Sequence, residues 1–101
     1  MDTKWLEDFV ALAETRSFTR SAQVRHVTQS ALSRRIQSLE AWVGVALVDR
    51  SSYPTRLTPA GTIFYAQALE LLQSLQTIRT QLRNPAAVQA GSTQADPDLG
   101  Q

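Results

Sequence analysis

The stretch from Thr28 to Leu39 constrains the fold most, because it combines a helix start with a continuous apolar stripe. Thr28 is a favourable N-cap, since its side-chain oxygen can accept a hydrogen bond from a backbone N–H that the first turn leaves unpaired. Leu32, Ile36 and Leu39 recur at spacings of four and three, which places them on one face of a helix. The sequence therefore predicts a helix over residues 28–43 with one buried face.

The opposite face of that helix is polar and carries no acidic residue. Its side chains can all form hydrogen bonds: Gln29, Ser30, Ser33, Arg34 and Gln37. A helix that is apolar behind and polar in front, with a guanidinium, suits insertion into the major groove of DNA. Arg35 points a further ~100° around the helix. For Arg35, DNA contact and a solvated surface charge both stay open.

Two helices are predicted before Thr28. Apolar residues repeat at helical spacing over residues 3–14, and Ser17 can cap a short helix over residues 18–25. Only two residues separate the short helix from Thr28, as in a helix-turn-helix, where the second helix enters the groove and the first crosses the DNA backbone. In the first helix, the outer positions are expected to be Lys4, Glu7, Asp8 and Glu14. In the second helix, the inner positions are expected to be Phe18 and Ala22, with Val24 as a further candidate.

Charge is unevenly distributed, although the net charge is only +1. Between Thr15 and Leu39 the basic residues are Arg16, Arg20, Arg25, Arg34 and Arg35, and that window holds no Asp or Glu. A local basic region is what a phosphate-facing surface needs, and a solvated arginine-rich face is the alternative. We expect Thr19 and Arg20 to contact phosphate, with a cap and a solvated charge as their alternatives. Thr28 is primarily a cap that also lies close enough to touch a phosphate.

Two short strands are predicted, over residues 46–48 and 55–57. They flank a loop of about six residues, and such a hairpin is too small to be stable alone. Packed against a helix-turn-helix, it becomes a wing. Arg50 and Arg56 flank the tip, where they could reach phosphate or the minor groove. Tyr53 shapes the tip and is a further candidate for DNA contact.

Thr58 and Pro59 predict the start of the last helix, because Thr caps and Pro at the first helical position loses no needed hydrogen bond. Over residues 59–83, apolar residues recur at alternating spacings of four and three: Phe64, Ala68, Leu71, Leu75, Ile78 and Leu82. This heptad pattern favours pairing with a second copy of the chain. Folding back over its own domain is the alternative.

From Asn84 onwards the sequence is small, polar and contains Pro and Gly, so too little apolar surface is present to order it. We therefore expect three parts: a DNA-binding domain over residues 1–58, a linker and dimerisation helix over 59–83, and a flexible tail over 84–101.

Several other classes of protein are disfavoured. The chain has no Cys and one His, so thiolate metal sites and His-based triads are not available. It has no glycine-rich phosphate loop and no nucleophile with a nearby base, so we expect neither an enzyme nor a cofactor. No apolar run approaches the roughly 18 residues of a membrane span, and the N-terminus does not resemble a signal peptide. These features favour the cytoplasm and no membrane partner.

Six motifs occur together along the chain: Phe9–Glu14, Ser17–Thr19, Val27–Gln29, Ala31–Arg34, Leu39–Glu40 and Leu57–Gly61. With this combination, residues 1–83 resemble the LysR-type transcriptional regulators. The resemblance implies a mainly α fold, a winged helix-turn-helix followed by a long linker helix that pairs, usually antiparallel, with that of a second subunit. It implies that a homodimer binds double-stranded DNA at a site with interrupted dyad symmetry. Residues 5–9 and 53–57 also resemble the subgroup around the hypochlorite-responsive regulator.

The resemblance also assigns roles to single residues. Gln29 would read bases, and Ser33 and Arg34 would contact base edges or phosphate. Arg56 would lie in or beside the minor groove, whereas Arg50 would either touch DNA or brace the wing.

The chain departs from the family pattern in two places on the helix over residues 28–43. Ser30 stands where proline is usual, and Arg35 replaces a common glutamine. In the family an effector domain follows the linker, and this chain stops before it, so no effector ligand is expected. A second hypothesis is a dimerisation module that pairs with full-length relatives and inactivates them.

Overall fold

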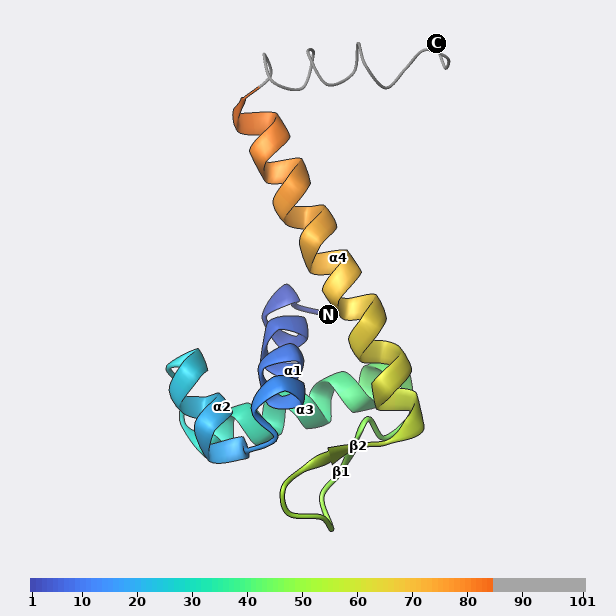
Figure 1. Cartoon of the computed structure of the whole chain (residues 1–101). Helices are drawn as coiled ribbons and strands as arrows, with labels where there is room; N and C mark the ends of the chain where they lie inside the picture. The colour runs from blue at the N-terminus through green and yellow to red at the C-terminus, as the bar shows by residue number, and fades with distance from the viewer. Residues whose placement is uncertain (85–101) are drawn as a thin grey trace. The chain divides into compact units, whose positions relative to one another are not determined.

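The computed structural model of the chain describes residues 1–84, so the tail expected from Asn84 onwards lies almost wholly outside the described residues. The elements, in order, are α1 (Thr3–Thr15), α2 (Phe18–Arg25), α3 (Gln29–Val43), β1 (Val48–Asp49), β2 (Arg56–Leu57) and α4 (Pro59–Arg83) (Figure 1). The mainly helical fold class and the winged helix-turn-helix are confirmed. The chain divides into two compact units, the first being Met1–Glu70 and the second beginning at Leu71.

The predicted N-caps are present. The side chains of Ser17, Thr28 and Thr58 each accept a hydrogen bond from the backbone N–H three residues further on, at 3.1, 3.0 and 3.0 Å. These bonds satisfy donors that the first turns of α2, α3 and α4 would otherwise leave unpaired. Gly44 follows α3 with a φ of 87°, the left-handed conformation in which glycine carries no steric cost.

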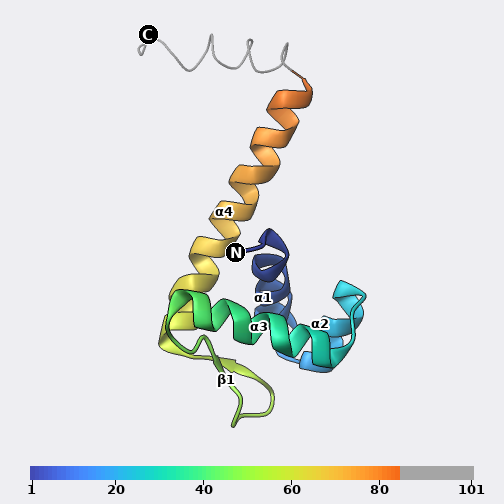
Figure 2. The same cartoon turned by 180° about the vertical axis from the view of Figure 1, so that it is seen from behind.

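The core of the first unit lies where α1, α2 and α3 meet (Figure 2). Its buried apolar cluster includes Phe9 and Leu12 of α1, Ala22 of α2 and Leu32 of α3. The expectation for Val24 is wrong: this side chain is 55% exposed, because it lies about 200° around α2 from Ala22.

The expectation for Asp8 is also wrong: its side chain, expected on the outer face of α1, is fully buried. Its Oδ1 accepts from Arg25 Nε of α2 at 2.8 Å, and its Oδ2 accepts from Arg35 Nη1 of α3 at 3.0 Å. Glu7 adds a further ion pair to Arg25 at 2.9 Å. Burial by itself lowers the pKa of Arg25, but the hydrogen bonds and charges of Asp8 and Glu7 outweigh it and raise that pKa. One carboxylate thus ties three helices together.

The wing is a two-stranded antiparallel hairpin in which Val48 lies opposite Leu57. Its strands have two residues each, so they are shorter than the three-residue strands predicted, and β1 begins two residues later. The backbone N–H groups of Leu47 and Val48 donate to Glu40 Oε2 on α3, at 2.8 and 3.1 Å. A side chain of α3 therefore holds the start of this segment together with Thr58, the residue that follows β2.

The first turns of α4 pack within the first unit. The rings of Phe64 and Phe9 meet edge to face with their centroids 5.4 Å apart, and Ala68 is fully buried. These two heptad residues therefore pack inside their own unit. The Leu47 carbonyl oxygen accepts from Thr58 N at 3.0 Å.

The second unit is described from Leu71 to Asn84. Its four heptad residues are exposed: Leu71 by 51%, Leu75 by 41%, Ile78 by 47% and Leu82 by 74%. No helix within residues 1–84 combines the length and apolar character that a membrane crossing requires.

Replacing Gly61 by Ala is expected to destabilise the chain, because a Cβ there would overlap the backbone carbonyl of Leu47. Ala ordinarily favours a helix over Gly by about 1 kcal/mol, but we expect the clash to outweigh this gain and to leave a net loss of about 1–3 kcal/mol. The free energy of unfolding, measured by denaturant titration, tests this. Thr62→Ala, at an exposed site in the same turn, is the control, and a Gly61→Ala variant as stable as the control would contradict the prediction.

Asp8→Ala is expected to lower the free energy of unfolding by about 2–4 kcal/mol, because it leaves two guanidinium groups without their shared partner. The loss should stay below that of a wholly buried pair, since the Arg25 and Arg35 side chains are 25% and 29% exposed. Glu7→Ala removes only the outer ion pair, whose carboxylate is 46% exposed, and should cost at most about 1 kcal/mol. Equal losses for the two variants would show that Asp8 has no special role.

Candidate nucleic-acid interface

The outer face of α3 carries most of the polar side chains predicted to face DNA. Gln29, Ser30, Arg34 and Gln37 are exposed, and Ser33 is half-buried. Behind them the apolar stripe of α3 is fully buried in the core. The Thr28 cap fixes the start of the helix, so Gln29 and Ser30 occupy its first turn, where a recognition helix makes contacts with base edges.

Arg35 does not share this exposed face. Its guanidinium is bound to the buried carboxylate of Asp8 at 3.0 Å, because the residue lies a further ~100° around α3 from Arg34. The sequence left DNA contact and a solvated charge open for Arg35. The structure instead shows an internal ion pair. No pattern within α3 signals it, because Asp8 is distant in sequence.

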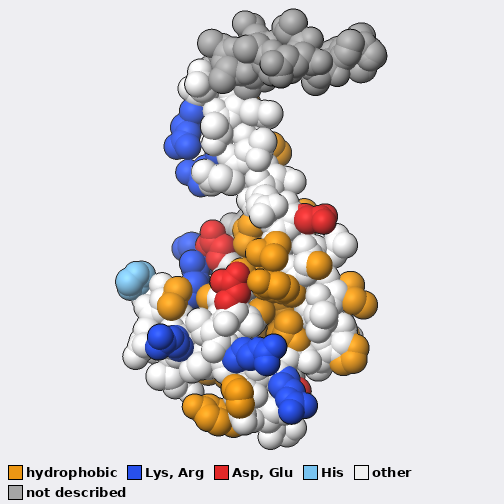
Figure 3. Space-filling model, viewed as in Figure 1, with side chains coloured by type: hydrophobic (Ala, Val, Ile, Leu, Met, Phe, Trp, Pro, Cys, Tyr) orange, Lys and Arg blue, Asp and Glu red, His pale blue; other side chains and the backbone are white. Residues whose placement is uncertain are grey.

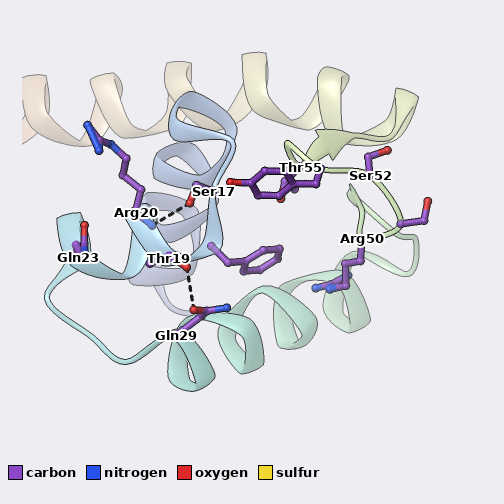
Figure 4. Close-up of a pocket in the computed structure, with 11 residues that line it drawn as sticks. Ser17, Thr19, Arg20, Gln23, Gln29, Arg50, Ser52 and Thr55 are labelled. Carbon is purple, nitrogen blue, oxygen red and sulfur yellow. Dashed lines mark hydrogen bonds between the residues drawn. The ribbon is translucent and has the colours of Figure 1, made fainter.

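A concavity of about 740 Å³ lies between the start of α2, the start of α3 and the wing (Figure 4). Five residues predicted to contact DNA line it: Thr19, Arg20, Gln29, Arg50 and Tyr53. The Tyr53 side chain is 93% exposed. Sequence reasoning missed further lining residues, namely Gln23, Ser51, Ser52 and Thr55. The only signal for them in the sequence is that they lie within a few residues of Thr19 or Tyr53. The sequence does not show that the wing lies beside α2, because folding alone brings the two together.

Two of these residues interact directly across the helix-turn-helix. Thr19 Oγ1 donates a hydrogen bond to Gln29 Oε1 at 3.0 Å. Figure 4 shows this bond, with the amide nitrogen of Gln29 on the side away from Thr19. Both residues are exposed. The pair therefore links α2 and α3 at the protein surface rather than in the core.

Arg50 braces the wing. Its Nη1 lies 3.0 Å from Glu40 Oε1, and its guanidinium carbon lies 5.7 Å from the centroid of the Phe18 ring. The other carboxylate oxygen of Glu40 accepts the two N–H groups at the start of the wing. Of the two family roles for this arginine, the geometry supports the bracing role.

The tip of the wing has its own hydrogen bonds. Asp49 accepts from the hydroxyl of Ser51 at 2.6 Å and from its backbone N–H at 2.9 Å. These bonds lower the pKa of Asp49, and the nearby positive charge of Arg56 contributes in the same direction. Thr55 N donates to Arg16 O at 3.0 Å, which ties the wing to the turn between α1 and α2.

The arginines separate into two groups. Arg25, Arg35 and Arg50 form ion pairs with carboxylates. Over residues 1–84, no salt bridge is present for the others on the first unit, namely Arg16, Arg20, Arg34 and Arg56, all of which are exposed. Basic side chains are visible over α2 and the wing in Figure 3. The positive charge that these ion pairs leave available to a ligand therefore comes from α2, α3, the wing and the residue that ends α1.

A metal site receives no support from the described part of the chain, in which no cluster of three His, Cys, Asp or Glu residues could hold an ion.

The solved structures that are similar to this chain include three LysR-type regulators or parts of them. The DarR regulator of Vibrio fischeri, in complex with DNA, is 42% identical, with a TM-score of 0.83 and coverage of 87% of this chain and 30% of DarR. The DNA-binding domain of BenM, a regulator of Acinetobacter baylyi, in complex with catB site 1 DNA, is 36% identical, with a TM-score of 0.83. The match covers 88% of this chain and 96% of the BenM domain. Full-length HypT of Salmonella typhimurium, a hypochlorite-specific LysR-type regulator, is 45% identical, with a TM-score of 0.79. The match covers 83% of this chain and 29% of HypT.

The chain spans 27% of the length of the first curated relatives that it matches, which are transcriptional regulators 42–43% identical to it. Residues 3–62 match the family described as bacterial regulatory helix-turn-helix protein, lysR family. This range contains α1, α2, α3, the wing and the first turn of α4. The chain therefore belongs to the lysR family of bacterial regulatory helix-turn-helix proteins.

Proposed function

We propose that this chain is the sequence-specific, double-stranded DNA-binding part of a transcription regulator. The observation that carries the proposal is the exposed, acid-free face of α3, held by a capped start and a buried stripe. Arg20 of α2 and Arg56 of the wing are exposed and form no salt bridge within residues 1–84, and a phosphate-facing surface requires such positive charge. The two similar domains solved in complex with DNA support the same function.

On this proposal α3 enters the major groove and the wing lies at the minor groove or the backbone. Gln29, Ser30, Ser33, Arg34 and Gln37 then face base edges or phosphates near them. Arg20, Thr28 and Arg56 contact the backbone, and Tyr53 at the wing tip approaches it. Arg35 and Arg50 act indirectly, because their guanidinium groups brace α3 and the wing.

We also propose that the chain binds DNA as a homodimer through α4, at a site with interrupted dyad symmetry. The exposed stripe of Leu71, Leu75, Ile78 and Leu82 supports this, because apolar side chains at heptad spacing favour a paired helix. Phe64 and Ala68 instead anchor the base of α4 to its own unit. Residues 59–83 then serve as the linker that joins the DNA-binding domain, residues 1–58, to its partner copy.

A finer placement, near the hypochlorite-responsive regulators, is supported by the sequence likeness at residues 5–9 and 53–57 and by the likeness to HypT. DarR is about as identical to this chain as HypT is, at 42% against 45%. The placement therefore concerns the DNA-binding part and not the signal that the regulator senses. With DNA as partner, we place the protein in the cytoplasm, on the bacterial nucleoid.

Selection of bound sequences from random duplexes tests the function, and enrichment of a two-half-site motif is the expected result. On the selected site, Arg34→Ala should weaken binding by about 1–3 kcal/mol if its guanidinium pairs with a guanine. Binding is measured by fluorescence anisotropy on selected and scrambled duplexes of equal length. An equal loss on both would show that Arg34 contacts only the backbone.

The same titrations give an internal control. Each phosphate neutralised adds about 0.9 to the slope of log affinity against log salt concentration. Arg34→Ala should leave that slope unchanged if Arg34 reads a base, whereas Arg20→Ala should reduce it if Arg20 neutralises a phosphate. A wild-type affinity that does not vary with salt would contradict an electrostatic interface.

The dimer is tested by replacing Leu75 and Ile78 together with Asp. This change places charge on the exposed stripe, and we expect monomers in sedimentation velocity together with weaker binding to the two-half-site duplex. Gln73→Asp with Thr77→Asp adds the same charge on the opposite face of α4 and should leave the dimer intact. A Leu75→Asp, Ile78→Asp variant that stays dimeric would show that the interface lies elsewhere.

The exposed α4 stripe also favours a second candidate function, a dimerisation module that inactivates full-length relatives by pairing with them. Two-half-site footprints produced by this chain alone would exclude that function as the main one.

A further inference from the structure

We propose that Thr19 is a positioning residue for base readout: it orients the Gln29 amide so that Gln29 recognises hydrogen-bond acceptors on the DNA base it meets. The inference rests on the proposed DNA-binding function and assigns the chemistry of one contact within it. The observation that motivates it is the hydrogen bond from Thr19 Oγ1 to Gln29 Oε1 at 3.0 Å.

Both ends of this hydrogen bond are attached to fixed backbone. Thr19 is in the first turn of α2, which the Ser17 side chain caps. Gln29 is the first residue of α3, which the Thr28 side chain caps. The side chains are exposed while their backbones are held, so the bond selects a conformation for an otherwise free glutamine. A held side chain loses less conformational freedom when DNA arrives.

The orientation of the amide has a chemical consequence. A glutamine that pairs with adenine in both directions turns both its oxygen and its nitrogen towards the base. Here Oε1 accepts from Thr19, and Nε2 lies on the far side of the amide (Figure 4). Gln29 therefore offers two N–H donors to DNA. The major-groove edges that present acceptors without a donor are those of guanine, through O6 and N7, and thymine, through O4.

The same bond changes the expectation for Thr19 itself. A hydroxyl group has one hydrogen to donate, and phosphate oxygens only accept. While Thr19 donates to Gln29, it cannot donate to a phosphate. Its role is then to affect which base is preferred, and not the affinity for DNA in general.

The test compares random-duplex selections for the wild-type chain, Thr19→Val and Thr19→Ser. Valine has the shape of threonine without the hydroxyl group, and serine keeps that group. We expect wild type and Thr19→Ser to favour guanine or thymine at one position of each half-site. Thr19→Val should lower that preference by about fivefold or more, as loss of a base-directed contact does, and leave the salt dependence of binding unchanged. Thermal unfolding of each variant checks that the fold is retained.

Variants of Gln29 provide the second arm. In a Gln29→Ala background, Thr19→Val should change no base preference, because the residue through which it acts is gone. Gln29→Glu keeps an oxygen for Thr19 but turns an acceptor towards DNA, so the preference should move to cytosine, which offers its N4 donor.

Three results would overturn the inference. One is a Thr19→Val motif identical to that of wild type. Another is an equal loss of affinity on selected and scrambled duplexes, which would make Thr19 a backbone contact. The third is a wild-type preference for adenine at the position that Gln29→Ala alters. Failure of the proposed function looks different: the wild-type chain would then enrich no motif at all.

Discussion

The buried carboxylate of Asp8 is the interaction on which the arrangement of α1, α2 and α3 depends. It is fully enclosed, and each of its oxygens accepts from an arginine of a different helix, Arg25 of α2 and Arg35 of α3. A buried charge is costly unless it is paired and hydrogen-bonded. The fold satisfies that demand only when α2 and α3 keep their places beside α1. The outer face of α3 can be presented to a ligand because its inner side is fixed in this way.

Glu40 plays the corresponding part for the wing. One of its oxygens accepts two backbone N–H groups before and within β1, and the other accepts from Arg50. A hairpin with two residues in each strand has too few internal hydrogen bonds to hold its own position. The carboxylate on α3 therefore holds the wing in place together with the bond from Thr55 N to Arg16 O. The recognition face and the start of the wing are thus attached to the same helix.

The helices could be predicted closely because their signals are local. A cap residue, an apolar repeat and a terminal glycine all lie within a few residues of the ends they define, and the caps Ser17, Thr28 and Thr58 act as predicted. The exposed candidates on α3 are visible from the same repeat, because they are what remains opposite the stripe. Arg35 could not be assigned this way, since nothing near it in sequence indicates a partner 27 residues earlier in the chain. The sequence pattern starts β1 two residues too early, because the backbone N–H groups of Leu47 and Val48 donate to a side chain of α3.

By itself, the sequence determined the elements, their order, and the polar face of the helix that begins after Thr28. Tertiary structure alone decided which arginines are available to a ligand, because ion pairing depends on distances between segments remote in the chain. It also divided the α4 heptads, burying Ala68 while leaving Leu75 exposed. Finally, it placed Thr19 beside Gln29. The physical reason is the same in each case: periodicity records the face on which a side chain lies, and packing determines what that face meets.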